Sequence, residues 1–502
     1  MRKKRPFIFE LLLLATLIAV SGLCCSGFLI GDPQPNSATS PGRTEERIQR
    51  IENGLVPPVL IKGRQSKMAL AERMKHHKTP GISIALVNDW KLEWARAYGV
   101  REAGSNDLVT PETLFQAASI SKPVTAMSVL SFVEQGKLKL DEDVNVKLIS
   151  WKIPDQQFTA EKKVTVRGLL SHSAGVTVHG FPGYGMDEPV PTLLEVLDGT
   201  KPANSAPIRV DIVPGSQLRY SGGGYCILQQ LLINVSRKPF PQIMQETVLA
   251  KIGMTHSTYE QPLPKNFWPR AATGHRSDGQ AVKGKWHTYP EMAPAGLWTT
   301  PTDLALFAIE LQNSKAGNSN KVLSKATTDE MLSKQMESAG LGVFLEGEGS
   351  TAYFSQGGAN EGFRCTLVAY RELGKGVVIM TNSDSGGQLA DEIVRAIASE
   401  YSWPDYPLPK EKTVSSSDPA KYSEFEGQYA LQPTFTLTIT RENDRLMSQV
   451  PGQAKCELLP EGKDKFFFAD FEAELTFVRD ETGKVTQLIV HQRGDHPAKK
   501  IK

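Results

Sequence analysis

Cysteine is scarce in this chain, and neither sign of charge predominates. The sequence has 5 Cys among 502 residues, with no Cys-x-x-Cys spacing and no Cys/His cluster, so we expect no structural zinc site. Its 57 Lys and Arg are balanced by 55 Asp and Glu, a formal net charge of +2. A near-neutral chain without a basic stripe is not expected to bind the phosphate backbone of a nucleic acid.

Two motifs of hydrolytic enzymes are also missing. The absence of H-E-x-x-H makes metal-dependent hydrolysis an unfavourable interpretation, and the absence of G-x-S-x-G argues against an α/β-hydrolase. We therefore expect neither a metal nor another cofactor. The composition, with 40% hydrophobic and 22% charged residues, is that of a globular protein.

The N-terminal segment has the composition of an export signal. Met1–Arg5 is basic and Leu11–Ile30 is largely apolar. Residues 1–30 are predicted to be a signal peptide with Ala19-Val20-Ser21 as its small-residue site, or else an uncleaved membrane anchor. Lipidation at Cys24 or Cys25 is disfavoured because Leu23 precedes them. We expect an exported protein, periplasmic or extracellular, that touches a membrane only through this segment.

Changes in composition along the chain predict two domains. Residues 31–43 and 403–420 are rich in Pro and Ser, as linkers are, and they delimit a domain at 44–402 and a smaller one at 421–502. Within the first, residues 81–100 are predicted to form a hairpin with its turn at Asn88-Asp89. The second shows alternating or short apolar runs that predict an antiparallel barrel or sandwich, at residues 434–440, 466–468, 473–478 and 485–490.

One serine and one lysine stand out in the segment FQAASISKPVTAMSVLSFVEQ. Apolar residues at helical spacing after Pro123 predict a buried helix, and Pro suits its first turn. Ser119 would then lie at the helix N-terminus with Lys122 one turn further on the same face. An apolar environment makes a lysine amine available as a base, which an activated serine nucleophile requires.

The motifs around this pair resemble the serine β-lactamase and penicillin-binding-protein superfamily, most closely its class C-type branch. Framework stretches such as LLSHSAG, GMTHS and AGLWTTPTD support the resemblance, which extends from about residue 68 to 400. The three motifs of the superfamily correspond to Ser119-Ile120-Ser121-Lys122, Tyr220-Ser221-Gly222 and Gln356-Gly357-Gly358. The region from about Tyr422, with FEGQY and GKVTQLIVHQRG, resembles the lipocalin-like β-domain of some relatives.

The resemblance implies a fold and a mechanism. The fold would be mixed α/β (α+β), an antiparallel sheet flanked by helices beside a helical lobe, followed by the small all-β domain. Ser119 would become acylated, Lys122 and Tyr220 would share the proton transfers, and the N–H groups of Ser119 and Ala359 would form the oxyanion hole. Side chains at Gly357 and Gly358 would obstruct the approach of substrate to the strand.

Two motif positions depart from the superfamily. Gly222 replaces an Asn that contacts the substrate's acylamide group in relatives, and Gln356 replaces a Lys or His that helps to bind a carboxylate. Because a neutral amide is no cation, recognition of penicillins or of a terminal D-alanine carboxylate is weakened. Arg364 could compensate, although a structural or solvated Arg is favoured.

Other conspicuous residues are given less weight. His172 lies in the LLSHSAG framework and is interpreted as structural, and His76-His77 as a solvated helix face. Tyr184 and Trp298 are either cleft or core residues. Beyond the signal segment, Cys226, Cys365 and Cys456 are interpreted as small buried thiols, with their pairing left open.

The sequence therefore predicts an exported serine hydrolase that forms an acyl-enzyme at Ser119 and cleaves a peptide, amide or ester bond. The substrate would be a small molecule or a peptide, with a peptidoglycan-derived D-amino-acid peptide as one option. One alternative is a β-lactamase or penicillin-binding protein proper. Another is a catalytically silent binding protein that keeps the fold. The sequence leaves the oligomeric state open.

Overall fold

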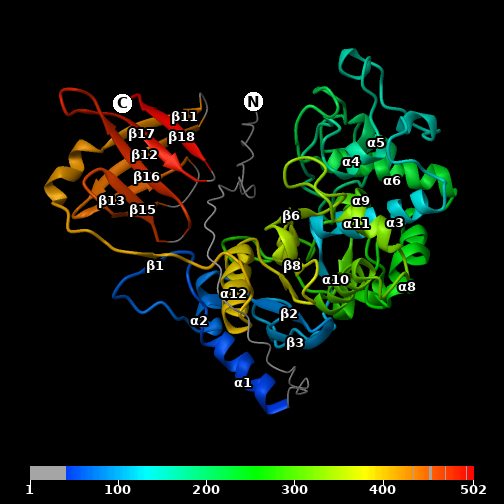
Figure 1. Ribbon diagram of the computed structural model, residues 1–502, viewed down its shortest axis with the longest axis horizontal. Helices are drawn as coiled ribbons and strands as arrows, with labels where there is room; N and C mark the ends of the chain where they lie inside the picture. The colour runs from blue at the N-terminus through cyan, green and yellow to red at the C-terminus, as the bar shows by residue number, and fades with distance from the viewer. Residues whose placement is uncertain (1–40, 433–434, 452–454, 470, 493) are drawn as a thin grey trace, which may run out of the picture. The chain divides into compact units, whose positions relative to one another are not determined.

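The computed structural model describes residues 41–502 apart from 433–434, 452–454, 470 and 493 (Figure 1). The expected signal at residues 1–30 lies outside the described residues, as does the linker at 31–43 up to residue 40. Within the described residues, no helix is both long and apolar enough to cross a membrane.

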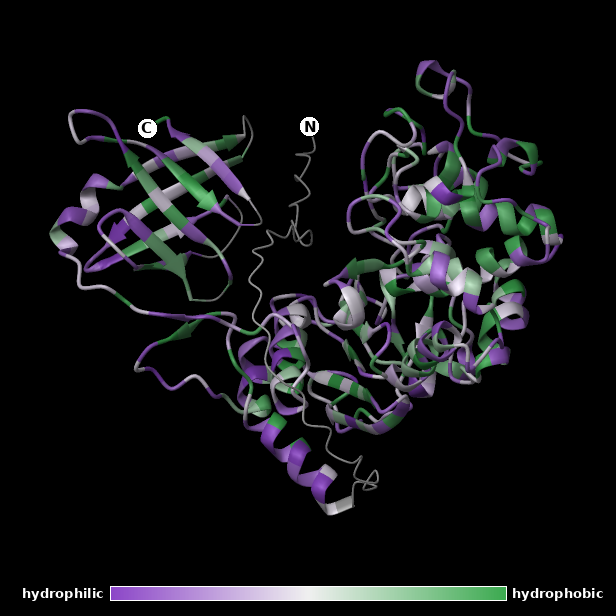
Figure 2. Cartoon of the chain, viewed as in Figure 1, coloured by the Kyte–Doolittle hydropathy of each residue, from purple (hydrophilic) through white to green (hydrophobic). Residues whose placement is uncertain are grey.

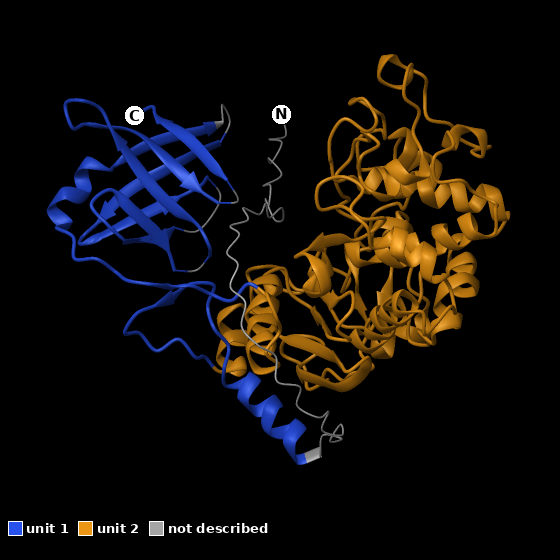
Figure 3. Ribbon diagram, viewed as in Figure 1, with its two compact units in different colours: residues 1–68, 407–502 blue, residues 69–406 orange. Residues whose placement is uncertain are grey.

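The described chain divides into two compact units (Figure 3). The larger comprises residues 69–406, and the smaller joins the chain up to residue 68 with residues 407–502. Residues 44–68, which the sequence groups with the larger domain, thus belong to the compact unit that contains the C-terminal strands. The predicted domain boundaries at 44–402 and 421–502 stay predictions.

A six-stranded antiparallel sheet forms the frame of the larger unit, in the order β3-β2-β9-β8-β7-β6. The hairpin predicted over residues 81–100 is confirmed, although its turn residues are Asp89 and Trp90 because Asn88 pairs with Lys91. Both turn residues have positive φ, 52° and 64°, as a tight hairpin requires. The strands are β2 (Gly81–Asn88), β3 (Lys91–Gly99), β6 (Phe344–Glu346), β7 (Tyr353–Asn360), β8 (Phe363–Tyr370) and β9 (Gly376–Thr381).

Helices lie on both sides of this sheet (Figure 1). One side packs against α10 (Pro301–Ala316) and the other against α12 (Gly386–Glu400). Strand β2, with the sequence GISIALVN, is buried along nearly its whole length because both of its faces are covered.

Glu392 ties α12 to the end of α2 (Leu70–His76). Its carboxylate accepts hydrogen bonds from Arg73 Nε at 2.9 Å and lies 3.1 Å from His77 Nε2. His77 is only 6% exposed, so the interpretation of His76-His77 as a solvated helix face is wrong for His77. A buried carboxylate must be paired, and these two side chains provide its partners.

The helical lobe surrounds α3 (Ser121–Glu134), the helix predicted after Ser119. Every residue of α3 from Ser121 to Phe132 is buried, which confirms the prediction of a core helix. The other helices of the larger unit are α4 (Val166–Leu170), α5 (Leu193–Asp198), α6 (Gly222–Ser236), α7 (Phe240–Met244), α8 (Ala250–Ile252), α9 (Met292–Ala295) and α11 (Lys325–Met331).

The C-terminal strands form a closed eight-stranded barrel in which neighbours along the chain are neighbours in space. The barrel closes where Tyr429 and Ala430 of the first strand pair with Lys500 and Lys499 of the last. The strands are β11 (Gly427–Gln432), β12 (Phe435–Glu442), β13 (Arg445–Gln449), β14 (Cys456–Pro460), β15 (Lys465–Phe468), β16 (Glu474–Arg479), β17 (Val485–His491) and β18 (Asp495–Lys500). The same unit contains α1 (Pro41–Glu52) and the parallel pair β1 (Leu60–Ile61) and β10 (Glu411–Lys412).

Side chains fill the interior of this barrel. Hydrophobic and hydrophilic residues alternate along its strands (Figure 2), as the period of a strand with one buried face requires. The rings of Phe425 and Phe477 pack at a tilt of 34° with centroids 4.4 Å apart, and Phe466 lies edge-on to both. An eight-stranded barrel is just wide enough for side chains to occupy its lumen. The predicted all-β C-terminal domain is therefore present, as a barrel and not a sandwich.

The two units have separate hydrophobic cores, so we expect them to unfold in two separate thermal transitions. Phe477→Ala removes a ring that is 3% exposed and should destabilise the barrel by about 3–5 kcal/mol, lowering one of two calorimetric transitions. Phe435→Ala, at a position 37% exposed in the same barrel, is the control and should shift that transition far less. A single transition that moves as a whole would contradict the prediction.

Candidate active site

Ser119 lies in the short helical turn Ala118–Ile120, which leads directly into α3. The chain just before it is held by β4 (Phe115–Gln116), which pairs with β5 (Trp298–Thr299). Ala118 has φ 49°, in the left-handed region, so the chain turns sharply there. Ser119 is half-buried between two fully buried neighbours, and its predicted place at the start of the helix is confirmed.

Lys122 is brought to Ser119 by the first turn of α3. Its Nζ donates hydrogen bonds to Ser119 Oγ at 2.8 Å and to the carbonyl oxygen of Pro294 at 3.1 Å. The Lys122 side chain is only 2% exposed. A buried amine with an acceptor on either side is fixed in place, with Ser119 Oγ within proton-transfer distance.

Tyr220 completes the predicted catalytic trio. Lys122 Nζ lies 4.7 Å from the centre of its ring. Tyr220 directly precedes Ser221, the N-cap of α6, whose hydroxyl accepts from Gly224 N at 3.0 Å and donates to Thr177 O at 2.7 Å. The cap fixes the backbone next to Tyr220. Ser119, Lys122 and Tyr220 are thus gathered in one place, as the motifs predict.

His172 packs against the ring of Tyr220. The two rings have centroids 4.4 Å apart, and His172 Nδ1 accepts a hydrogen bond from Ser221 N at 3.2 Å. The pKa of His172 lies well below its ordinary value, chiefly because the ring is buried and secondly because Lys122 is nearby. The ring is therefore neutral, as an acceptor at Nδ1 must be. This confirms the interpretation of His172 as a structural residue.

Strand β7 passes close to the loop that carries Ser119. A Cβ at Gly358 would lie 2.3 Å from the carbonyl oxygen of Ala117, whereas a Cβ at Gly357 would have nothing nearer than 3.9 Å. Gly358 is therefore required by backbone packing, and the explanation from substrate approach is wrong for this residue. Ala359 is exposed, and its predicted oxyanion role with Ser119 stays a prediction.

Neither Gln356 nor Arg364 takes the place of the cation expected on β7 in relatives. Gln356 is 6% exposed and donates its Nε2 hydrogen to the carbonyl of the next residue at 2.9 Å. Arg364 donates to Asp384 Oδ1 at 2.9 Å and to Asn360 O at 2.8 Å. Arg364 therefore serves a structural pair, as the favoured interpretation has it.

Gly222 lies at the first position of α6, where a side chain would meet the loop ahead of it. A Cβ there would be 3.0 Å from Phe181 Cε2 and 3.1 Å from His179 O. The sequence drew attention to Gly222 alone. Phe181 and His179, which come together with it, stand in a stretch without periodicity (VHGFPGYG) and could not be selected from the pattern.

Glu291 is a second residue that the sequence did not indicate. It is fully buried just before α9, and its Oε2 has no hydrogen-bond partner among the described residues. Tyr184, 2% exposed, approaches its other oxygen at 3.5 Å, and burial raises the pKa of Glu291 to about 8. Of the two alternatives for Tyr184 and Trp298, cleft or core, the structure shows that both are core residues.

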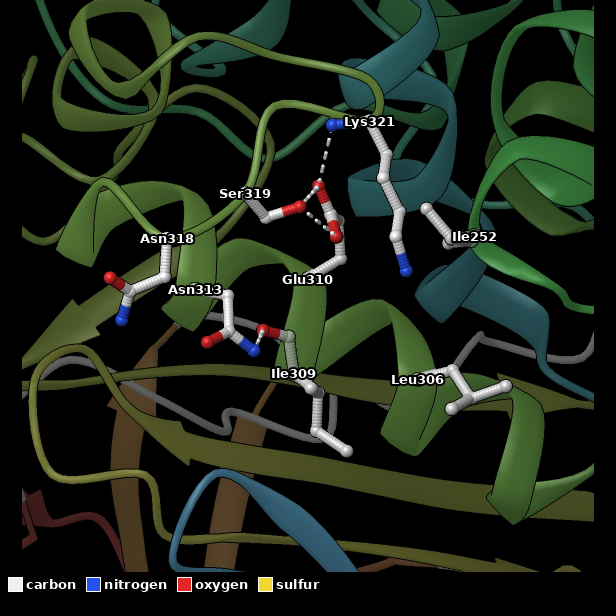
Figure 4. Close-up of a pocket in the computed structure, with 8 residues that line it drawn as sticks. All are labelled: Ile252, Leu306, Ile309, Glu310, Asn313, Asn318, Ser319 and Lys321. Atoms are coloured by element: carbon white, nitrogen blue, oxygen red, sulfur yellow. Dashed lines mark hydrogen bonds between the residues drawn. The ribbon is translucent and has the colours of Figure 1, made fainter.

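A separate pocket of about 260 Å³ lies beside α10 (Figure 4). Glu310 at its base accepts hydrogen bonds from Ser319 at 2.8 Å and from the backbone N–H of Lys321 at 3.2 Å. None of the predicted site residues lines this pocket. Its one carboxylate, that of Glu310, therefore already has partners.

The sequence also makes predictions about metal-ligating side chains and about the thiols. Over the described ranges, no three His, Cys, Asp or Glu side chains are grouped as they would be around a metal ion. Cys226 and Cys365 are buried free thiols, and Cys456 is half-buried. Burial raises the pKa of both buried thiols, which keeps them protonated and unreactive.

The sheet flanked by helices, with a Ser-x-x-Lys pair and a Tyr in contact, defines the class of protein: the serine β-lactamase and penicillin-binding-protein superfamily. The chain belongs to the beta-lactamase family, whose model matches residues 68–401, and thus to serine hydrolases of the β-lactamase and penicillin-binding-protein kind. A second model, a domain of unknown function named DUF3471, matches residues 411–500.

Individual relatives agree with this assignment. Penicillin-binding protein 4* of Bacillus subtilis (strain 168) is 22% identical over 81% of this chain and 92% of its own length. The octameric penicillin-binding protein homologue from Pyrococcus abyssi has the same fold, with a TM-score of 0.59, 21% identity and coverage of 86% of this chain and 98% of its own. The D-amino acid amidase from Ochrobactrum anthropi SV3 has a TM-score of 0.55 and 19% identity, over 71% of this chain and 99% of its own.

The two glycines of β7 provide a matched test of backbone packing. Gly358→Ala should displace the Ala117–Ala118 loop, lower Tm and slow any reaction of Ser119 by at least about tenfold, because the contact is with backbone and cannot rotate away. Gly357→Ala has room for its methyl group and should leave Tm nearly unchanged. Thermal melts of both variants check this. Equal melting temperatures would refute the packing argument.

Glu291 makes the stability of the larger unit depend on pH. Its pKa is raised from 4.5 to about 8 in the folded chain, so its contribution is complete below pH 4.5 and is lost as the pH rises towards 8. Glu291→Gln cannot titrate and should remove this loss, which is on the order of 4 kcal/mol at about 1.4 kcal/mol per pKa unit. Denaturant unfolding at pH 5 and pH 8 measures it. Parallel pH profiles for the two proteins would rule the assignment out.

Proposed function

We propose that the chain is an exported serine hydrolase that forms an acyl-enzyme at Ser119 and cleaves a peptide, amide or ester bond. The observation that carries the proposal is the 2.8 Å hydrogen bond between Lys122 Nζ and Ser119 Oγ, made by a lysine that is 2% exposed. A structural lysine has no need of an accessible serine as its partner. A nucleophile requires a base at this distance.

The proton transfers follow from the same contacts. Ser119 Oγ attacks the substrate carbonyl and gives its proton to the Lys122–Tyr220 pair, which passes a proton to the leaving amine or alcohol as the bond to it breaks. Water then attacks the acyl-enzyme, loses its proton to the pair and releases the acid while Ser119 regains its hydrogen. Lys122 and Tyr220 act as one coupled unit because Lys122 Nζ lies 4.7 Å from the centre of the Tyr220 ring.

Oxyanion stabilisation is assigned to backbone N–H groups of Ser119 and Ala359. Strand β6 pairs only with Tyr353–Ser355 of β7, so this edge of β7 is unpaired by β6 from Gln356 onward. An unpaired strand edge presents N–H and C=O groups to an extended substrate. One such donor contributes roughly 3–4 kcal/mol to the transition state of acyl transfer in other enzymes.

The bond type is supported by the relatives and limited by the charges. Penicillin-binding proteins and a D-amino acid amidase are among the similar proteins, which favours an amide or peptide, including a peptidoglycan-derived one. The side chains of Gln356 and Arg364 both form hydrogen bonds within the protein. Neither therefore provides a free cation for a substrate carboxylate at β7. This disfavours a β-lactamase or penicillin-binding protein proper. Export rests on the basic and apolar composition of residues 1–30.

Covalent labelling tests the mechanism. The purified chain is mixed with an activated phosphonate and, separately, with a penicillin, and the intact mass is measured. We expect a phosphonate adduct and no penicillin adduct, and loss of the phosphonate adduct in Ser119→Ala. Ser121→Ala, two residues away on the same helix, is the control and should keep the adduct, since Ser121 Oγ is buried and accepts from Leu297 N at 3.0 Å.

Each other outcome has a definite meaning. Adducts with both reagents would support a penicillin-recognising enzyme in spite of Gln356. No adduct with either would overturn the proposal in favour of a silent binding protein. An adduct that persists in Ser119→Ala would show that the nucleophile is another residue.

A further inference from the structure

The wall of the site on the Tyr220 side is made of rings. His172 and His179 lie on the Tyr220 ring with centroid distances of 4.4 Å and 4.8 Å, and Phe344 lies at 6.1 Å. Desolvation and the nearby Lys122 lower the pKa of both histidines, so both rings are neutral at pH 7. The amine of Lys122 at this wall already donates hydrogen bonds to Ser119 and Pro294.

A run of glycines seats a loop against this wall. Gly222 N donates to His179 O at 2.9 Å and Gly223 N donates to Val178 O at 3.0 Å. A Cβ at Gly223 would lie 2.6 Å from Thr177 O, so the backbone of the loop rests directly on the first turn of α6. This explains the glycines at positions 222 and 223, where a helix begins and glycine is a costly choice for helix formation.

The seated loop places Phe181 where a side chain at position 222 would project. The ring carbon Phe181 Cε2 would be 3.0 Å from that Cβ, and the ring packs against the hydrophobic core of the larger unit while staying half-buried. A benzene ring has no strong hydrogen-bond donor or acceptor. A substrate amide set against it would leave water without gaining a partner.

We propose that Phe181, held by Gly222 and Gly223, is a specificity-determining residue that forms an apolar subsite for the acyl part of the substrate. The inference rests on the proposed acyl-enzyme function. Within the proposed range of bonds, the subsite narrows the substrate to esters or amides of uncharged, apolar carboxylic acids. An acylamino group beside the scissile carbonyl, as a peptidoglycan-derived peptide has, is selected against. Phe181 acts on the choice of acyl group and takes no part in proton transfer.

Two esters of equal length and the same leaving group test the proposal. The full chain hydrolyses p-nitrophenyl pentanoate and p-nitrophenyl N-acetylglycinate, and kcat/KM is corrected for each uncatalysed rate. We expect a preference of about tenfold or more for pentanoate. Phe181→Ala should reduce this preference at least about fivefold, and Phe181→Leu should retain most of it. Gly222→Asn combined with Phe181→Ala makes room for an amide and should reverse the preference.

A matched variant separates specificity from stability. Phe158 is also half-buried and packed on the same core, so Phe158→Ala should lower Tm comparably but leave the ratio of the two kcat/KM values unchanged. An equal effect of Phe181→Ala on both esters, or a wild-type preference for the N-acetylglycinate, would overturn the subsite. If that happens while Ser119 still reacts with the phosphonate, only the subsite fails. If neither turnover nor labelling occurs, the proposed function fails with it.

Discussion

The hydrogen bond from Lys122 to the carbonyl of Pro294 joins residues 172 positions apart and holds the site together. An amine that is 2% exposed needs hydrogen-bond acceptors close by, and Ser119 supplies one and the α9 turn the other. The requirement fixes the first turn of α3 against α9. Thr125 reinforces the same contact by donating to Ala293 O at 3.2 Å. The position of the nucleophile thus depends on segments far apart in the chain.

Close approach of backbones is the second condition, and small residues provide it at two places. Gly358 lets β7 touch the Ala117 carbonyl, and Gly222-Gly223 lets the 177–181 loop touch the start of α6. At Gly358 and Gly223 the missing side chain would have met a backbone carbonyl, where no rotation could relieve the clash. The site is therefore shaped as much by absent side chains as by the three reactive ones.

Periodic segments could be predicted from the sequence because their burial follows their spacing. The core helix after Ser119, the 81–100 hairpin and barrel strands such as β12 are of this kind. Strand β18 was not recognisable, because it contains Pro497 and Ala498 is the one residue buried in it, so its order comes from pairing on both sides. The interpretation of His77 as solvated was wrong for a related reason: its partner Glu392 is 315 positions away in the chain. Of the site, the proximity of Ser119, Lys122 and Tyr220 was predictable from motifs. Phe181 and Glu291 were not, since their roles arise from contacts that leave no local pattern.

The pairing of β11 with β18 sets the order in which the smaller unit can be completed. The strand that closes the barrel, Asp495–Lys500, is the last of the eight to leave the ribosome, and it bonds to both β17 and β11. Until it arrives, seven strands form an open sheet with two unsatisfied edges, the state in which strands most readily join those of another chain. The barrel can therefore close only after all eight strands have been synthesised, and a chain interrupted before β18 would keep both edges exposed.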